Sequence, residues 1–139
     1  MTRFFTRIAA ASLMALVSTA AFAAEPENTL VISLKDGDVT IALRPDLAPK
    51  HVEQIKALTR KGAYDNVVFH RVIDGFMAQT GDVQFGNSAK DFNPAQAGMG
   101  GSDLPDIKAE FSQEPFVRGT VGMARAQSPD SANSQFFIT

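Results

Sequence analysis

The sequence predicts a mainly β fold, an antiparallel β-barrel or sandwich with a single helix closing one end. Three observations predict it. About six short segments consist of strand-forming residues, and several alternate apolar with more polar side chains. Asp-Gly pairs at 36–37 and 74–75 mark tight turns between such segments. Only one segment carries apolar residues at a helical spacing.

Two segments near the start form the first predicted hairpin. Apolar residues alternate with less apolar neighbours over residues 30–34, which is the period of a half-buried strand. The Asp36-Gly37 turn follows, and residues 39–43 alternate in the same way as the antiparallel partner. Pro45 ends the second strand, because proline cannot donate to a sheet ladder.

The one predicted helix covers residues 49–61. Pro49 suits the first helical position, where its missing N–H costs nothing, and Gly62 suits the position just past the end. The apolar residues of the helix recur every three positions, at Val52, Ile55 and Leu58. His51 is polar, and we expect it to face solvent.

The second half of the chain is predicted to hold four further strands separated by polar loops. We expect these strands at residues 67–73, 76–80, 117–125 and 134–139. The stretch from 81 to 110 is rich in Gly, Asn, Asp, Ser and Pro. A loop of that length in a small domain usually forms a lid or the wall of a groove.

The chain ends within the last of these predicted strands. Residues 134–139 are mostly strand formers with no polar tail after them. A barrel cut at this point would leave an unpaired strand edge. We therefore expect the sequence to be a fragment, with its barrel incomplete at the C-terminus.

The first 23 residues resemble a secretory signal peptide. Two arginines precede an apolar run, and alanines at 21 and 23 occupy the positions that a signal peptidase reads, so we expect cleavage between Ala23 and Ala24. This predicts a short linker at 24–28, one domain over 29–139, and a periplasmic or secreted location. A membrane anchor is the alternative, but the apolar run is short for a span of ~20 residues. We expect no membrane span after the signal is removed.

Composition and charge exclude some classes of function. The chain has 15 acidic and 13 basic residues, and two of the basic ones lie in the predicted signal. The remaining domain is acidic, which argues against nucleic acid as a partner. The sequence has no cysteine, so it excludes disulfides and thiol chemistry. We expect a monomer.

Alternation along the predicted strands decides which side chains share a face. In residues 76–80, Phe76 and Ala78 share one face, whereas Met77 and Gln79 share the other. Phe76 and Gln79 can line one groove only if the strand twists or bulges. Spacing alone therefore does not establish a site.

Two longer runs resemble the cyclophilin family. FHRVIDGFMAQTGD, residues 69–82, is similar to the family's signature segment. GTVGMARAQSPDSANSQFFIT, residues 119–139, is similar to its second half-site, and the order and separation of the runs also match. Ala48-Pro49 and residues 108–111 fit the same family. The resemblance covers residues 29–139 and implies a cyclophilin-like antiparallel β-barrel capped by a helix.

The resemblance implies a peptidyl-prolyl cis-trans isomerase that needs no metal or cofactor. Rotation about an X–Pro bond faces a barrier of about 20 kcal/mol and makes no covalent bond. The enzyme must therefore bind the twisted amide better than either planar form. The twisted proline nitrogen regains a lone pair, for which a fixed guanidinium is a natural partner. Arg71 is the candidate catalytic residue; its other interpretation is a surface ion pair with Asp74 or Glu110.

The resemblance also implies a set of substrate-binding residues, which are His70, Phe76, Met77, Gln79, Ala124, Arg125, Ala126, Gln135 and Phe137. The two phenylalanines and the methionine would hold the proline ring, and the two glutamines would lie near the peptide backbone. Residues 124–126 would line the groove beside the residue before proline. Without the resemblance, the phenylalanines are typical core residues, and Gln135 is a typical partner for nearby backbone groups. Arg125 and Asn133 depart from the family pattern, in which a small amide and a glycine are usual.

The implied partners are proline-containing unfolded or extended polypeptides, so the enzyme would assist the folding of exported proteins. The resemblance also implies inhibition by a cyclosporin-type macrocycle, and we expect Arg125 to weaken it. Two alternatives remain open. A non-catalytic chaperone would bind extended peptides in the same groove. A small hydrolase would use Ser134 with His70, although no nucleophile elbow surrounds Ser134.

Overall fold

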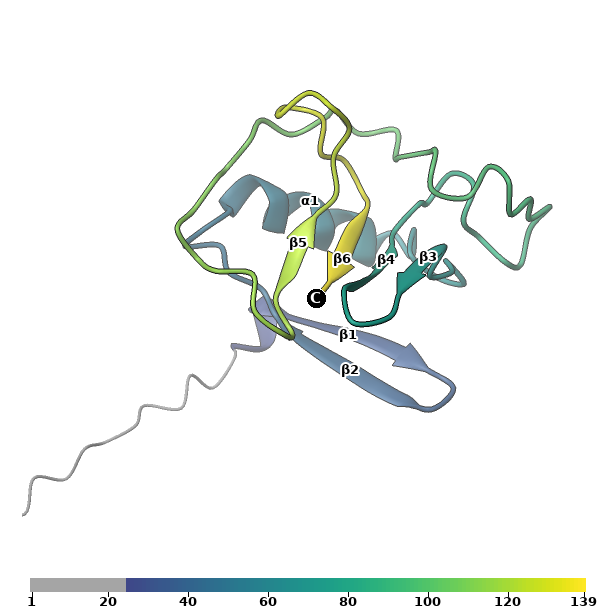
Figure 1. Ribbon diagram of the computed structural model, residues 1–139, viewed down its shortest axis with the longest axis horizontal. Coiled ribbons are helices and arrows are strands. Elements are labelled where there is room, and N and C mark those ends of the chain that lie inside the picture. Colours follow the sequence, from purple (N-terminus) through teal and green to yellow (C-terminus); the bar gives the residue numbers. More distant parts are fainter. Residues whose placement is uncertain (1–24) are drawn as a thin grey trace, which may run out of the picture.

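The computed structural model describes residues 25–139, which form two antiparallel β-sheets and one α-helix (Figure 1). The predicted signal peptide lies outside the described residues. Most of the predicted linker forms a short 3₁₀ helix, Pro26–Asn28, directly before the first strand. Within residues 25–139, no helix has the length and apolar character needed to cross a membrane.

The first sheet is the hairpin that the sequence predicts. Strands β1 (Thr29–Leu34) and β2 (Gly37–Ala42) pair antiparallel, with Leu34 opposite Gly37 at the turn. Leu30 lies opposite Ile41, and both side chains pack in the core. The alternation of apolar residues thus places one face of this hairpin against the rest of the domain.

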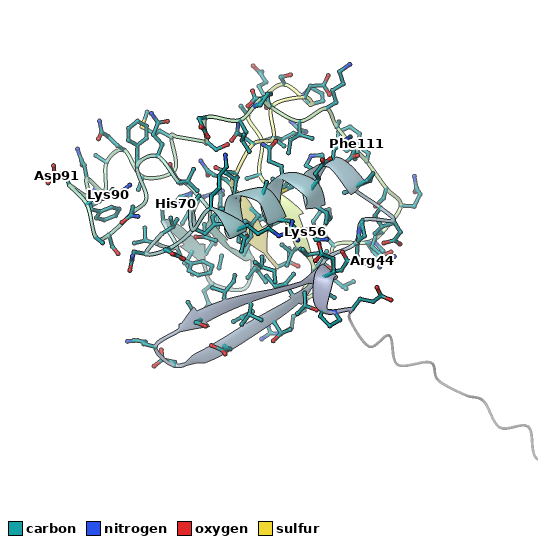
Figure 2. All side chains as sticks on the ribbon, turned by 180° about the vertical axis from the view of Figure 1, so that it is seen from behind. Arg44, Lys56, His70, Lys90, Asp91 and Phe111 are labelled. Carbon is teal, nitrogen blue, oxygen red and sulfur yellow. The ribbon has the colours of Figure 1, made fainter. Side chains whose placement is uncertain are left out.

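Helix α1 (Pro49–Arg60) begins at the predicted proline, and Lys61 forms its C-terminal cap. The two opposite views in Figures 1 and 2 agree that α1 lies across one face of the second sheet. Lys56, labelled in Figure 2, donates hydrogen bonds to Glu27 Oε1 (3.0 Å) and Asn28 Oδ1 (2.8 Å). These bonds attach the 3₁₀ helix to α1.

The expectation that His51 faces solvent is wrong. His51 is only 8% exposed and lies four and seven residues before Ile55 and Leu58, so it shares their buried helix face. Its ring Nδ1 lies 2.6 Å from Glu110 Oε2. A carboxylate from a distant segment therefore satisfies the polar ring inside the protein, which the sequence pattern did not reveal.

The second sheet carries the two runs that resemble the cyclophilins. Its strand order is β3-β4-β6-β5, and all neighbours are antiparallel. Its strands are β3 (Arg71–Ile73), β4 (Met77–Thr80), β6 (Phe136–Ile138) and β5 (Val121–Met123). These strands are shorter than predicted. Val67, for example, makes only an isolated bridge to Asn87 rather than extending β3.

The core lies between the two sheets and the helix. It centres on Ile41 of β2, Ile55 of α1 and Phe136 of β6. Tyr64 packs edge-on against Phe136, with ring centroids 5.9 Å apart. Within residues 25–139, no strand of the first sheet pairs with one of the second, so the sheets do not close into a barrel. The mainly β, antiparallel, helix-capped fold is confirmed.

Gly81 follows β4 at a point where the backbone just before β6 comes very close, so we predict that Gly81→Ala destabilises the fold. A Cβ at Gly81 (φ +89°) would lie 2.5 Å from the backbone oxygen of Ser134. Left-handed strain and this clash together should lower the free energy of unfolding by roughly 3 kcal/mol. Urea unfolding followed by circular dichroism measures the change.

Gly75→Ala is the matched control. Gly75 has a similar backbone conformation (φ +69°), but a Cβ there would meet no atom within 4 Å. It should therefore cost only the strain of a left-handed residue, about 1 kcal/mol. Equal losses for the two variants would contradict the close approach of Gly81 to Ser134.

Candidate functional site

One row of residues crosses the whole second sheet. Arg71 lies opposite Gln79, Gln79 opposite Phe137, and Phe137 opposite Gly122. Residues directly opposite each other in a sheet point to the same face. Met77 is two residues from Gln79 and therefore also lies on this face. The sheet register thus gathers a guanidinium, an amide and two apolar side chains from three strands.

Phe76 reaches the same region from outside the strand. It lies in the turn between β3 and β4, where its N–H donates to Ile73 O at 3.0 Å, and it is 61% exposed. Strand alternation does not apply to a turn residue. Alternation therefore does not separate Phe76 from Gln79, and both residues line one wide hollow.

That hollow is wide and open, with a volume of about 1220 Å³. It extends from the face just described to α1 and the first sheet. The predicted site residues that line it are Arg71, Phe76, Met77, Gln79, Ala124, Arg125 and Phe137. His70, Ala126 and Gln135 do not line it.

The aromatic part of the hollow contains a residue that the sequence analysis missed. Phe116 stacks on Phe137, with ring centroids 5.6 Å apart and an interplanar angle of 23°. A side chain at Gly122 would meet this ring, since a Cβ there would lie 2.5 Å from Phe116 Cε1. Phe116 lies in an irregular loop, where no periodicity marks it as part of a site.

Arg71 is an exposed cation at one edge of the hollow. Within residues 25–139, it forms no ion pair and its side chain makes no hydrogen bond. The two alternative ion pairs, with Asp74 and with Glu110, do not form, and Glu110 instead contacts His51. The hydrogen-bond donors of the Arg71 guanidinium are therefore unused within the described residues.

Gln79 and Gln135 form a fixed pair of amides. Gln79 Nε2 donates to Gln135 Oε1 at 2.9 Å. Gln135 Nε2 donates to the carbonyls of Gly98 (3.0 Å) and Gly100 (2.7 Å) in the long loop. Gln135 thus connects Gln79 to the loop. Within the described residues, Gln79 Oε1 accepts no hydrogen bond.

The remaining predicted residues make contacts with the loops and strands around the hollow. His70 packs against Gly98, where a Cβ would lie 2.7 Å from the imidazole Cδ2, and its buried ring nitrogens have no partner within the described residues. The Ala124 N–H donates to Gln135 O (2.9 Å), which continues the ladder between the two segments. Arg125 folds back onto the carbonyls of Ala126 (2.9 Å) and Gln127 (3.2 Å).

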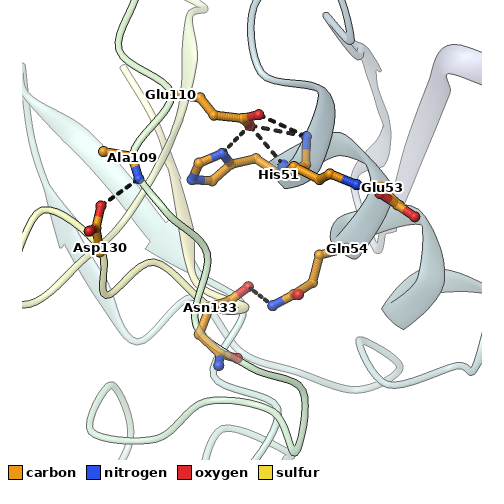
Figure 3. Close-up of polar contacts among 8 residues, drawn as sticks. His51, Glu53, Gln54, Ala109, Glu110, Asp130 and Asn133 are labelled. Carbon is orange, nitrogen blue, oxygen red and sulfur yellow. Dashed lines mark hydrogen bonds and ion pairs between the residues drawn. The ribbon is translucent and has the colours of Figure 1, made fainter.

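Glu110 attaches the loop wall to the start of α1 (Figure 3). Its carboxylate accepts the backbone N–H groups of Lys50 and His51, each at 3.1 Å, and contacts the His51 ring. Because Ala48 offers no side-chain cap, this distant carboxylate satisfies donors that a helix start leaves free. Burial raises the pKa of Glu110, but the hydrogen bonds from His51 and Lys50 outweigh it, so the pKa lies below its ordinary value.

Asp82 plays a similar part at the other end of the loop. It is fully buried, and its carboxylate accepts four backbone N–H groups, from Gln84, Phe85, Gly98 and Gly100. Burial raises the pKa of Asp82, but these four bonds outweigh it and lower the pKa below its ordinary value. The sequence analysis did not single out Asp82, although it closes the first of the two runs.

Ser134 is not placed for hydrolysis. It is fully buried, and its Oγ donates to Gly81 O at 2.7 Å. The His70 ring nitrogens make no hydrogen bond within residues 25–139, so the two residues do not form a nucleophile–base pair. The same residues contain no group of three or more His, Asp or Glu side chains that could hold a metal ion.

Comparison with protein families and known proteins gives a consistent result. Residues 29–139 match the family described as cyclophilin type peptidyl-prolyl cis-trans isomerase/CLD. A Brucella suis protein named "Probable peptidyl-prolyl cis-trans isomerase" is 67% identical over 135 residues, which cover 94% of this chain and 68% of that protein. A Brucella abortus protein of the same name matches equally.

Solved cyclophilin structures share the fold. The cyclophilin AquaCyp293 from Hirschia baltica superimposes with a TM-score of 0.66 at 27% identity, covering 82% of this chain and 57% of that one. A Cryptosporidium parvum cyclophilin solved in the presence of the dipeptide Ala-Pro gives a TM-score of 0.65 at 31% identity, covering 79% and 66%. The present chain therefore spans less than two thirds of each of these structures.

The low pKa values of Asp82 and Glu110 predict a loss of stability in acid. A carboxyl whose pKa is lower in the folded than in the unfolded state stabilises the fold above its unfolded pKa, and this contribution disappears as the pH falls through the folded value. The ordinary values are 3.8 for Asp82 and 4.5 for Glu110. The free energy of unfolding should therefore decrease as the pH falls below about 4.5.

Urea titrations at a series of pH values measure this dependence. Glu110→Gln should lower stability at neutral pH and make the acid loss less steep, because one of the two carboxyls no longer titrates. A wild-type stability that stays constant or rises on acidification would contradict the assignment of both carboxylates as hydrogen-bond acceptors in the fold.

Proposed function

Because the chain belongs to the cyclophilin-type peptidyl-prolyl cis-trans isomerase family, we propose that it rotates X–Pro peptide bonds in the hollow beside β4 and β6. The observation that carries this proposal is the position of Arg71. Its unpaired guanidinium lines the same hollow as the Phe76 and Phe137 rings. A cation and an apolar pocket are the two features that this reaction requires of a protein.

The reaction demands little chemistry of the protein. Rotation breaks the amide resonance and turns the planar proline nitrogen into a pyramidal acceptor, with no proton or group transferred. Catalysis then consists of binding the twisted form more tightly than the planar forms. A hydrogen bond from Arg71 to the proline nitrogen strengthens only as the bond twists, so it acts in the transition state.

The expected size of this effect shows that Arg71 does not act alone. A million-fold acceleration needs about 8 kcal/mol of preferential stabilisation. One hydrogen bond from a charged donor supplies roughly 1.5–3 kcal/mol. The rest comes from holding the proline ring against Phe137, Phe76 and Met77, so that the amide can twist while the ring stays in place.

Gln79 is suited to hold the substrate backbone. It lies opposite Arg71 in the sheet, and its Nε2 is already bound to Gln135. Its Oε1 is therefore the free atom, and it can accept a peptide N–H of the substrate. A backbone anchor of this kind would let the enzyme accept many sequences around the proline.

We further propose that the substrates are exported proteins, so that the enzyme assists folding in the periplasm or outside the cell. The support is the signal-like sequence of residues 1–23. Amino-terminal sequencing of the exported protein would give Ala24 as the first residue. Recovery of the intact N-terminus from the cytoplasm would contradict this location.

A second candidate is a chaperone that binds extended peptides in the same hollow without accelerating rotation. The hollow is open and has exposed aromatic side chains, and these features favour peptide binding whether or not rotation is accelerated. The two candidates differ in the role of Arg71, since binding alone has no need for a donor beside the twisting bond.

We predict that Arg71→Ala lowers kcat/KM for a proline peptide by between about tenfold and 150-fold, the equivalent of one charge-assisted hydrogen bond. Peptide affinity should change much less, because the bond forms in the twisted state. A coupled isomerisation assay and peptide titration measure the two quantities. Arg71→Lys, which keeps the charge but loses the planar fork, should fall between the wild type and Arg71→Ala.

Unchanged isomerisation in Arg71→Ala would reject this mechanism. Peptide binding in a wild-type protein that has no isomerase activity would favour the chaperone.

A further inference from the structure

Asp82 is a charged side chain at 0% exposure, and the mechanism above does not use it. A buried carboxylate is costly unless hydrogen bonds replace the water that it loses. Asp82 obtains these bonds from backbone N–H groups only, and two of its four donors belong to the loop behind Gln135.

We propose that Asp82 is a positioning residue for the isomerase reaction. It holds Gly98 and Gly100 so that their carbonyls fix the amide of Gln135, and Gln135 in turn fixes the orientation of Gln79 beside Arg71. This inference rests on the proposed function, because Gln79 is given its role there.

The first step runs from Asp82 to the loop. One carboxylate oxygen, Oδ2, accepts the N–H of Gly98 at 2.7 Å and that of Gly100 at 3.0 Å. This stretch belongs to no helix or strand, so these bonds replace the ladder that would otherwise hold it. The contact is also tight, since a Cβ at Gly100 would lie 2.7 Å from Asp82 Oδ1.

The second step runs from the loop to Gln135. The same two residues whose N–H groups bind Asp82 offer their carbonyls to Gln135 Nε2, at 3.0 Å and 2.7 Å. An amide nitrogen has two hydrogens, and both are used here. Gln135 can therefore not rotate its amide without losing two bonds, and its Oε1 must face Gln79.

The third step decides which atom of the Gln79 amide remains free for a substrate. Because Gln135 presents an oxygen, Gln79 must present its Nε2 to it, at 2.9 Å. This leaves Gln79 Oε1, an acceptor, as the free atom on the strand opposite Arg71. A flipped Gln135 would reverse both amides and place a donor there instead, which would no longer accept a substrate N–H.

Only a carboxylate satisfies this arrangement at position 82. Its Oδ1 accepts N–H groups from Gln84 (3.0 Å) and Phe85 (2.9 Å), while Oδ2 accepts those of Gly98 and Gly100. Asparagine has the same shape but turns one of the two acceptors into a donor. Asp82→Asn therefore places an NH₂ donor against backbone N–H donors, while the volume of the side chain stays nearly the same.

The test is a double-mutant cycle on the full chain that combines Asp82→Asn with Gln135→Ala. In the wild-type background, Asp82→Asn should lower kcat/KM by roughly tenfold. In the Gln135→Ala background it should lower kcat/KM less than about twofold, because the residue through which it acts is gone. Its effect on unfolding free energy should remain in both backgrounds.

Asp130→Asn is the matched control. Asp130 also accepts a backbone N–H from a distant loop, that of Ala109 at 2.8 Å, but it has no contact with Gln135. Its effect on kcat/KM should be the same with and without Gln135→Ala. An Asp82→Asn effect of equal size in the two backgrounds would overturn the proposal, because it would show a general loss of structure.

A second readout does not depend on activity. The Gln135 side-chain amide protons should give a shifted, slowly exchanging pair of NMR signals that Asp82→Asn returns to the position and exchange rate of a free amide. If the signals are unchanged, Asp82 does not fix Gln135. If Asp82→Asn does not fold, Gly100→Ala is used in the same cycle with the same expectations, because its methyl group would displace the Asp82 carboxylate.

The two hypotheses fail in different ways. A wild-type chain with no isomerase activity would overturn the proposed function, whereas the NMR comparison would still decide whether Asp82 orients Gln135. An active wild type with an additive cycle would overturn only the positioning role.

Discussion

The pairing of β4 with β6 is the constraint on which the rest of the site depends. Gln79 lies opposite Phe137, and the flanking strands extend the same row to Arg71 and Gly122. Because side chains alternate along a strand, Phe137 shares the face of Gln79 and Arg71, whereas the adjacent Phe136 points to the opposite face and packs in the core. A slip of β6 by one residue would place Phe136 opposite Gln79 and turn Phe137 toward the core. One backbone register therefore determines both what holds the domain together and what it offers to a peptide.

The loop of residues 81–110 contains no helix or strand and is held by side-chain contacts. Asp82 and Glu110 accept backbone N–H groups from segments distant in sequence. Asn133 does the same for Ser102 (2.8 Å) and donates to Leu104 O (3.0 Å). Asn133 is one of the two departures from the family pattern, and its contacts explain it as a support of the loop wall. Fixed polar contacts of this kind give an irregular loop the rigidity that a binding surface requires.

The features that the sequence predicted are those determined by neighbours along the chain. The first hairpin follows from alternation and the Asp-Gly turn, and α1 follows from Pro49 and its apolar spacing. Of the ten residues that the resemblance named, seven line the hollow and three, His70, Ala126 and Gln135, do not. The strand pattern alone separated Phe76 from Gln79, because alternation does not show where a turn ends and a strand begins. His51, Asp82 and Phe116 were misjudged or missed for a common reason. His51 contacts Glu110 59 positions away, Asp82 binds Gly98 and Gly100 16 and 18 positions away, and Phe116 stacks on Phe137 21 positions away. No local period in the sequence records contacts of this kind.

The most direct test of the account is the position of a bound proline. An NMR titration with the dipeptide Ala-Pro, using labelled phenylalanine, methionine and arginine side chains, reports which groups the ring contacts. The account predicts contacts from the proline ring to Phe137, Phe76 and Met77, together with a shift of the Arg71 guanidinium signals. A ring bound on the outer face of the first sheet, near the exposed Val31, with the Arg71 signals unmoved, would contradict it.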